Sequence, residues 1–181
     1  MESNPWTLLK RKRVYENPWI AVDHDDVLNA AGNPGIYGVV RFENLAIGIV
    51  TLDNEGKTTL IGQWRYPLER YSWEIPEGGG PKDEAPLETA KRELLEETGL
   101  TAMKWTKLLE MDLSNSVTDE RAHLFLAEDL SQGEAAPEET EVFLLKKIPL
   151  ADAVQLVING EIRDSLAVTG LLAAERFLKN R

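Results

Sequence analysis

Apolar residues in the first part of the chain fall in short runs separated by turn-forming residues. The runs cover residues 14–15, 19–22 and 37–42, and the turn signals cover residues 17–18 and 32–35. Short runs of β-type residues bounded by Gly, Pro and Asn predict strands joined by turns. We therefore predict a small antiparallel sheet within residues 1–44. Its apolar content is too low to fold alone, so it should pack on the main domain or on a second subunit.

Two longer apolar runs follow, at residues 45–52 and 58–63, on either side of an Asp-Asn-Glu-Gly segment at residues 53–56. This composition favours a turn, so we predict a hairpin. The periodicity then becomes helical. Leu87, Ala90 and Leu94 recur at intervals of three and four residues, which predicts an amphipathic helix.

The sequence also contains start and stop signals for this helix. Asp83 is the predicted N-cap, Pro86 falls in the first turn, and Gly99 stands where a left-handed C-terminal residue is expected. Beyond it the pattern alternates strands with helices, which predicts an α/β class with a mixed sheet over residues 45–181. The expected strands cover residues 104–111, 122–127 and 142–148, the expected helices 149–158 and 164–179, and a polar loop 131–140.

Composition narrows the function classes. The formal net charge of −11 argues against general binding to nucleic acid or to anionic membranes. The longest apolar run, residues 45–50, is far shorter than the roughly 20 residues that span a bilayer. The absence of cysteine removes thiolate chemistry and disulfides from consideration. We therefore expect a cytoplasmic protein.

The predicted central helix carries the candidate chemistry. Glu93, Glu96 and Glu97 are three and four residues apart, so they share one helix face. An acidic helix face is usually only solvated. However, clustered carboxylates are also the ligands that hard cations such as Mg²⁺ and Mn²⁺ prefer.

The wider segment matches every fixed position of the Nudix box, G-x5-E-x7-R-E-U-x-E-E-x-G-U, in which U is an aliphatic residue. The chain therefore resembles the Nudix hydrolases. The resemblance implies a Nudix α/β/α sandwich with a mixed β-sheet, and Mg²⁺-dependent cleavage of a nucleoside diphosphate linked to another group. The matching residues are Gly78, Glu84, Arg92, Glu93, Leu94, Glu96, Glu97, Gly99 and Leu100.

Flanking segments resemble the ADP-ribose and related NDP-sugar pyrophosphatases within this family. Two departures stand out: residues 114–117 replace a Ser-Pro-Gly segment, and Glu77 replaces the usual alanine. The segments that carry the resemblance are residues 15–19, 63–66, 73–76 and 159–162.

The resemblance also implies roles for individual residues. Glu93, Glu96, Glu97 and the carbonyl of Glu77 would hold Mg²⁺ or Mn²⁺, and Glu93 and Glu97 could grip one cation or bridge two. Arg92 would orient these carboxylates. Glu139 is the expected general base, and Glu141 is an accessory metal ligand or an alternative base.

For the substrate, the resemblance implies phosphate contacts from Arg41 and Arg65. Trp19 would stack on a nucleobase, although a purely structural role, with burial at the subdomain junction, is an equally good interpretation. Glu120 would lie near the catalytic centre or the terminal sugar, and Glu74 is a further candidate contact. Because relatives form dimers in which the N-terminal strands complete the partner's site, we expect a homodimer.

We therefore expect hydrolysis of the pyrophosphate bond of an NDP-sugar to a nucleoside monophosphate and a sugar phosphate. ADP-ribose is the leading substrate, and GDP-mannose or other NDP-sugars come next. Two alternatives remain: hydrolysis of nucleoside triphosphates or dinucleoside polyphosphates, and a non-catalytic ligand sensor with the same fold.

Overall fold

The computed structural model describes residues 3–133 and 144–181. The described part of the chain contains both strands and helices, and its strands form three sheets. The first sheet holds β1 (Thr7–Glu16), β2 (Ile20–Leu28) and β3 (Pro34–Phe42). The second, in the order β7-β4-β9-β8, holds β4 (Asn44–Thr51), β7 (Glu77–Pro81), β8 (Leu100–Asp112) and β9 (Arg121–Gln132).

The third sheet, in the order β10-β5-β6, holds β5 (Lys57–Arg65), β6 (Arg70–Glu74) and β10 (Leu144–Pro149). A short 3-10 helix (Tyr66–Leu68) joins β5 to β6. The helices are α1 (Pro86–Thr98), α2 (Leu150–Ile158) and α3 (Ser165–Lys179). None of the described helices has the length and apolar character that crossing a membrane would require.

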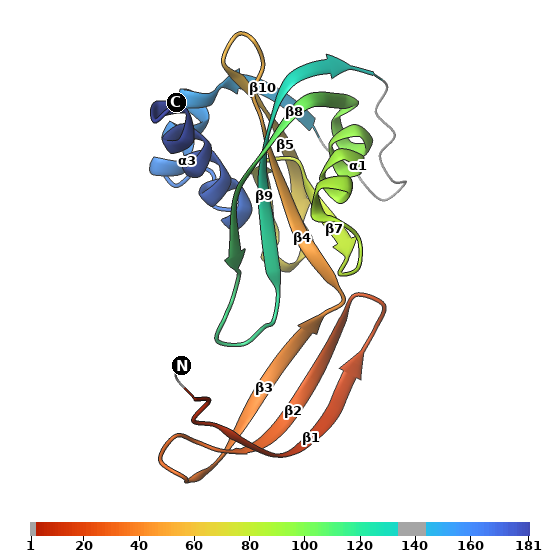
Figure 1. Ribbon diagram of the computed structural model, residues 1–181, viewed down its shortest axis with the longest axis vertical. Coiled ribbons are helices and arrows are strands. Elements are labelled where there is room, and N and C mark those ends of the chain that lie inside the picture. The colour runs from red at the N-terminus through yellow and green to blue at the C-terminus, as the bar shows by residue number, and fades with distance from the viewer. Residues whose placement is uncertain (1–2, 134–143) are drawn as a thin grey trace.

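The second sheet lies between helices, with α1 on one face and α3 on the other (Figure 1). Alternate residues of β4 explain this arrangement, because successive side chains of a strand point to opposite faces. Ile47 and Ile49 pack with Ala90 and Leu94 of α1 in one core cluster. Val50 packs in a second cluster with α2 and α3. The expected α/β/α sandwich with a mixed sheet is confirmed, since β4 pairs parallel with β9 and antiparallel with β7.

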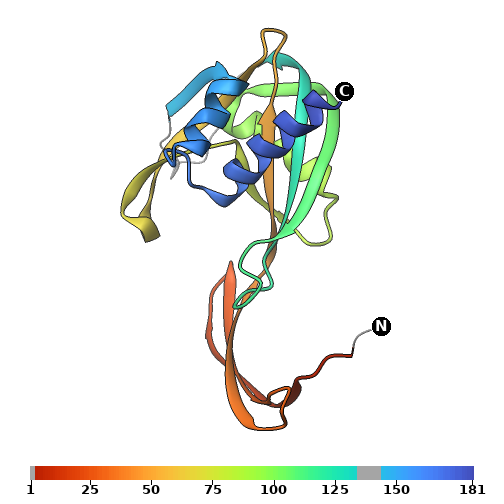
Figure 2. The same ribbon diagram turned by 90° about the vertical axis from the view of Figure 1, so that its left-hand side faces the viewer.

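The N-terminal sheet projects from this body (Figures 1 and 2). All ten residues of β1 are exposed, whereas one side of β2 buries Ala21, Asp23, Asp25 and Val27. Two of these four inward-facing residues are acidic, and a buried carboxylate is costly unless it is paired. The expected antiparallel sheet is present, but its inner face is partly polar.

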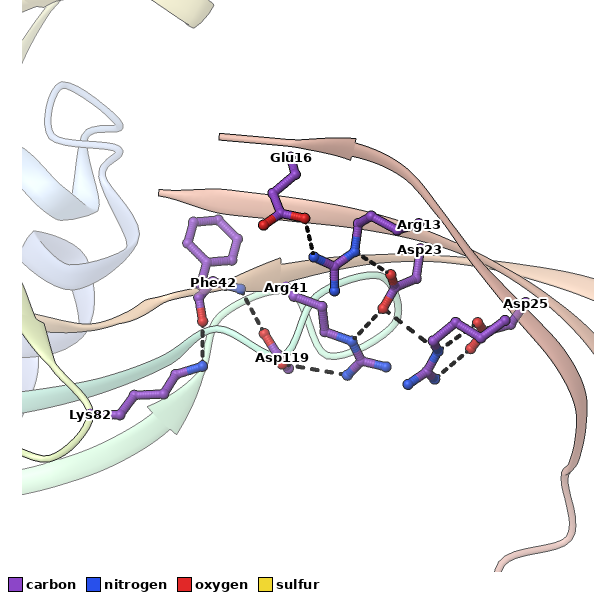
Figure 3. Close-up of polar contacts among 9 residues, drawn as sticks. Arg13, Glu16, Asp23, Asp25, Arg41, Phe42, Lys82 and Asp119 are labelled. Carbon is purple, nitrogen blue, oxygen red and sulfur yellow. Dashed lines mark hydrogen bonds and ion pairs between the residues drawn. The ribbon is translucent and has the colours of Figure 1, made fainter. Parts of the chain in front are cut away.

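Arginines of the neighbouring strand pair with these buried acids (Figure 3). Arg11 donates to both oxygens of Asp25 at 2.8 and 2.7 Å, and Arg13 donates from Nε to Asp23 at 2.6 Å. Their hydrogen bonds hold the pKa values of both aspartates below the usual range, although burial opposes the shift. Charge pairing therefore adds to the antiparallel backbone pairing that joins β1 to β2.

Contacts with the loop between β8 and β9 attach the N-terminal sheet to the body. Asp119 accepts a hydrogen bond from the Phe42 N–H at 2.9 Å, and the Tyr37 hydroxyl donates to the Ser116 carbonyl at 2.6 Å. The Lys82 ammonium donates to the Phe42 carbonyl from the other side (Figure 3). The end of β3 is therefore held from two directions.

Two local predictions are wrong. The predicted hairpin at residues 45–63 has its turn at Asp53, but β4 and β5 belong to different sheets. Both edges of β4 are already paired with β7 and β9. Asp83 is not the N-cap of α1, since the cap residue is Ala85. A residue before proline is pushed out of the helical region, and Ala85, which precedes Pro86, has ψ of 124°.

Candidate active site

The acidic face of α1 packs against the glycine-rich strand β7. The three glutamates of this face differ in exposure: Glu97 is 4% exposed, the Glu93 side chain 13% and the Glu96 side chain 39%. Glu97 accepts a hydrogen bond from the Glu77 N–H at 3.0 Å, which partly offsets the cost of its burial. Glu93 and Glu97 therefore lie against the strand, and Glu96 lies at the more exposed edge of the same face.

Gly78 makes room for the Glu93 carboxylate. A Cβ atom at this position would lie 2.2 Å from the carboxyl carbon of Glu93, far inside van der Waals contact. The first glycine of the box therefore has a steric reason to be glycine.

Arg92 ties the remaining carboxylates together. Its Nη1 donates to Glu93 at 2.8 Å and to Glu96 at 3.0 Å, and its Nη2 donates to the Gly79 carbonyl at 3.2 Å. The expected orienting role agrees with this geometry.

The donor set fits a hard divalent cation. It offers three carboxylates on one helix face, next to a strand whose glycines leave space for them. The chain has no cysteine thiolate, and the imidazoles lie elsewhere: His24 on β2 and His123 on β9. Glu93, Glu96, Glu97 and the main chain of Glu77 are thus the residues that could hold Mg²⁺ or Mn²⁺.

A cavity of about 290 Å³ opens at β7, the strand against which this face packs. Trp19 and Phe42 line it from the N-terminal sheet, and the body supplies the rest of the wall. Three of the predicted substrate contacts, Trp19, Arg65 and Glu120, therefore meet at one cavity, together with Glu77. The remaining lining residues are Asn44, Leu45, Ala46, Gly78, Gly79 and Leu166.

Arg65 is the cationic group of this cavity. Its Nε donates to both oxygens of Glu74 at 2.9 and 3.1 Å, and its Nη2 donates to Glu74 at 2.6 Å. Nη2 also pairs with the carboxylate of Glu77. Burial opposes the charge on Arg65, but the hydrogen bond with Glu74 and the charge of Glu77 raise its pKa above the usual value. Arg65 therefore stays protonated.

Glu74, Glu77 and Asp164 form a second acidic group behind Arg65, with one oxygen of each within 4.8 Å of the others. Burial raises the pKa of Glu77 well above its ordinary value, and the charges of Asp164 and Glu74 raise it further. No spacing along the chain predicts this grouping. Asp164 also caps α3 by accepting from the Ala167 N–H at 2.8 Å, whereas the pattern only placed it at the start of a helix.

The other predicted substrate residues, two of which also line the cavity, differ from Arg65 in their contacts. Arg41 donates to Asp23 at 3.3 Å and to Asp119 at 3.4 Å, so it links the N-terminal sheet to the body (Figure 3). Glu120 is partly buried; burial, and then the charge of Asp119, raise its pKa. Trp19 is 68% exposed at the cavity, so it is available for stacking. Glu74 is buried and contacts Arg65.

The predicted bases lie beyond what the structure describes. Glu139 and Glu141 belong to residues 134–143, which are outside the described residues. Their roles remain predictions.

Two protein-family models match the chain. The model of the NUDIX domain matches residues 43–167, and that of the nucleoside diphosphate sugar hydrolase N-terminal domain matches residues 6–40. The chain belongs to the NUDIX family and is a Nudix hydrolase.

Its relatives include enzymes of similar length. The chain is 35% identical over 167 residues to the ADP-ribose pyrophosphatase of Bacillus subtilis, covering 91% of this chain and 90% of the relative. It is 36% identical over 132 residues to the ADP-ribose pyrophosphatase of Mycobacterium tuberculosis, covering 71% and 63% respectively. The crystal structure of an ADP compounds hydrolase superposes with a TM-score of 0.88 at 23% identity, over 99% of this chain and 97% of that one, and supports the fold.

Proposed function

We propose that the protein hydrolyses the pyrophosphate bond of NDP-sugars in a Mg²⁺-dependent reaction, with ADP-ribose as the leading substrate and GDP-mannose or another NDP-sugar next. The observation that carries the proposal is the position of Glu77, whose N–H donates to Glu97 on the acidic face of α1 and which also lines the cavity that holds Arg65. The carboxylates suit a cation, and the guanidinium suits a phosphate. The relatives named as ADP-ribose pyrophosphatases support this choice of substrate.

Glu93, Glu96, Glu97 and the carbonyl of Glu77 would hold the metal. Bound Mg²⁺ or Mn²⁺ would supply charge neutralisation at the pyrophosphate and would acidify a water. Arg92 keeps Glu93 and Glu96 in place through the two hydrogen bonds described above.

The substrate-binding residues divide by chemistry. Arg65 would contact a phosphate, and Arg41 would add a second cation where the N-terminal sheet meets the body. Trp19 would stack on the nucleobase, and Glu120 would face the terminal sugar. We propose that Glu74 acts through Arg65, since both oxygens of its buried carboxylate accept from that guanidinium.

Deprotonation of the attacking water needs a base. We propose Glu139 for this role, with Glu141 as accessory metal ligand or alternative base. The support is the resemblance of the segment before the last strand to that of NDP-sugar pyrophosphatases.

We also propose that the protein acts in the cytoplasm as a homodimer formed through the N-terminal sheet. That sheet exposes large apolar side chains on a projecting unit, which a second copy could cover (Figure 2). Gel filtration with light scattering tests this, and a monomer at working concentration would contradict it. The exposed residues are Trp6, Leu8, Leu9, Val14, Tyr15, Trp19 and Ile36.

A substrate panel tests the activity. We expect release of a nucleoside monophosphate from NDP-sugars with Mg²⁺, and loss of this release when a chelator is added. Greater activity on nucleoside triphosphates or dinucleoside polyphosphates would favour the alternative hydrolase function. Binding of NDP-sugars without turnover would favour a ligand sensor.

A further inference from the structure

Glu77 has a main chain and a side chain that serve different neighbours. Its N–H donates to Glu97 of α1, on the side of the predicted metal ligands. Its carboxylate instead pairs with Arg65, and its side chain is 8% exposed. The side chain therefore contacts the predicted phosphate-binding arginine, not the acidic face of α1.

The contacts of Arg65 leave one edge of its guanidinium open. A guanidinium has five N–H donors in a fixed plane. Glu74 engages Nε and Nη2, and Glu77 engages Nη2. Among the described residues, Nη1 meets no hydrogen-bonding partner, while the side chain is 36% exposed and lines the cavity. Two carboxylates thus fix the plane of the group and leave Nη1 for a ligand.

We propose that the side chain of Glu77 is a positioning residue that fixes the Arg65 guanidinium at the cavity and so determines how tightly the site binds the phosphates of its substrate. The proposal rests on the proposed function, in which Arg65 contacts a substrate phosphate. Glu74 holds one edge of the guanidinium through Nε and Nη2. Glu77 supplies a second anchor, one residue before the glycine that accommodates Glu93.

The surroundings of Glu77 indicate which substitution should conserve this function. One of its oxygens, Oε2, is buried and has no hydrogen-bond partner within the described part of the chain, and Asp164 lies close by. Glutamine at this position could accept from Arg65 through its amide oxygen and donate its N–H to Asp164. Alanine would remove both contacts.

Steady-state kinetics on ADP-ribose with Mg²⁺ test the proposal. We expect Glu77→Ala to raise KM about tenfold or more, as loss of a charge-assisted contact would, with kcat little changed. Glu77→Gln should keep KM within about threefold of wild type, because the contact with Arg65 survives. Arg65→Ala should raise KM further, and adding Glu77→Ala to it should have no additional effect, since the two residues act as one unit.

Glu128→Ala is the matched control. Glu128 is also a largely buried carboxylate paired with an arginine, Arg181, at 2.7 Å, but it does not line the cavity. Its loss should lower the melting temperature without moving KM. Equal KM for wild type and Glu77→Ala, or additive effects of the Arg65 and Glu77 substitutions, would overturn the proposal.

Two binding measurements distinguish a positioning role of Glu77 from a metal-binding role, and a failure of this proposal from a failure of the proposed function. Equilibrium dialysis with Mn²⁺ should give the same number of bound ions for wild type and Glu77→Gln; loss of one ion would place a cation on Glu77 and overturn the positioning role. Calorimetric binding of Mg²⁺-pyrophosphate should weaken in Glu77→Ala and not in Glu128→Ala. This second result tests the positioning role even if the wild-type protein hydrolyses no NDP-sugar, an outcome that would overturn only the proposed function.

Discussion

Glu97 accepts a hydrogen bond from the main-chain N–H of Glu77 at 3.0 Å, which fixes one end of α1 against β7. Glu97 thereby combines a structural contact with its predicted role as metal ligand. The two can be separated because a neutral amide can still accept this hydrogen bond.

We predict that Glu97→Gln keeps the fold and lowers kcat by more than about 100-fold, since loss of even an outer partner of a metal costs about 10- to 100-fold. Mg²⁺-dependent kinetics and thermal melting check this. Glu88→Gln is the control, because Glu88 is exposed on the same helix and pairs with Lys91. Similar losses of kcat in both variants would mean that activity depends on the total negative charge of the helix and not on Glu97 itself.

Gly78→Ala tests the space reserved for Glu93. The new Cβ would overlap the end of the Glu93 side chain, which is flexible enough to swing away. We therefore expect a nearly unchanged melting temperature and a large loss of Mg²⁺-dependent activity. In the control, Gly79→Ala, the new Cβ would come no closer than 3.4 Å to Asn44, so most of the activity should remain. An active Gly78→Ala enzyme would contradict the steric role.

For the general base, we predict that Glu139→Gln loses far more kcat than Glu138→Gln. Only a carboxylate that reaches the attacking water can accept its proton. Measurements of kcat at saturating substrate and Mg²⁺ compare the two. Equal losses, or none, would place the base at another residue, with Glu141→Gln as the next variant to measure.

Acid should loosen the N-terminal sheet before it affects the body. The folded pKa values of Asp23 and Asp25 lie below the ordinary 3.8, so their contribution to stability is complete above that value. This contribution to stability is lost as the pH falls through the lowered pKa values that the two aspartates have in the folded protein. Amide NMR signals of β2 should therefore weaken below about pH 4 while those of β4 persist.

The Asp23→Asn and Asp25→Asn double variant provides the comparison. Its N-terminal sheet should already be weakened at neutral pH and should show little further change on acidification. Parallel loss of β2 and β4 signals in the wild type would show that the pairs with Arg11 and Arg13 do not hold this sheet.

Much of the fold was predictable because local patterns and tertiary structure agree. The left-handed Gly99 ends α1, as its position in the sequence predicts, and α3 (Ser165–Lys179) agrees with the predicted helix at residues 164–179. The spacing of Ala90 and Leu94 correctly identified the buried face of α1. The partners of β4 were not predictable, because the apolar run alone does not say which strands lie beside it.

In the site, too, local contacts were predictable and contacts between distant segments were not. Periodicity put Glu93 and Glu97 on one face, since helical neighbours are fixed by local geometry. The contact between Arg65 and Glu77 joins residues on separate strands, and the approach of Asp164 depends on where α3 packs. Such contacts follow from tertiary packing, which spacing along the chain does not encode.

The charged interior of the N-terminal sheet affects how unfolding can be observed. The heat capacity of unfolding and the denaturant m-value both grow with the apolar surface that becomes exposed. Of the four residues that β2 buries, Asp23 and Asp25 are charged and Ala21 is small. Detachment of this sheet would therefore add little to either quantity. A calorimetric or denaturant curve would mainly report the helix-covered body, so a loss of order at the N-terminal sheet needs a residue-specific probe to be seen.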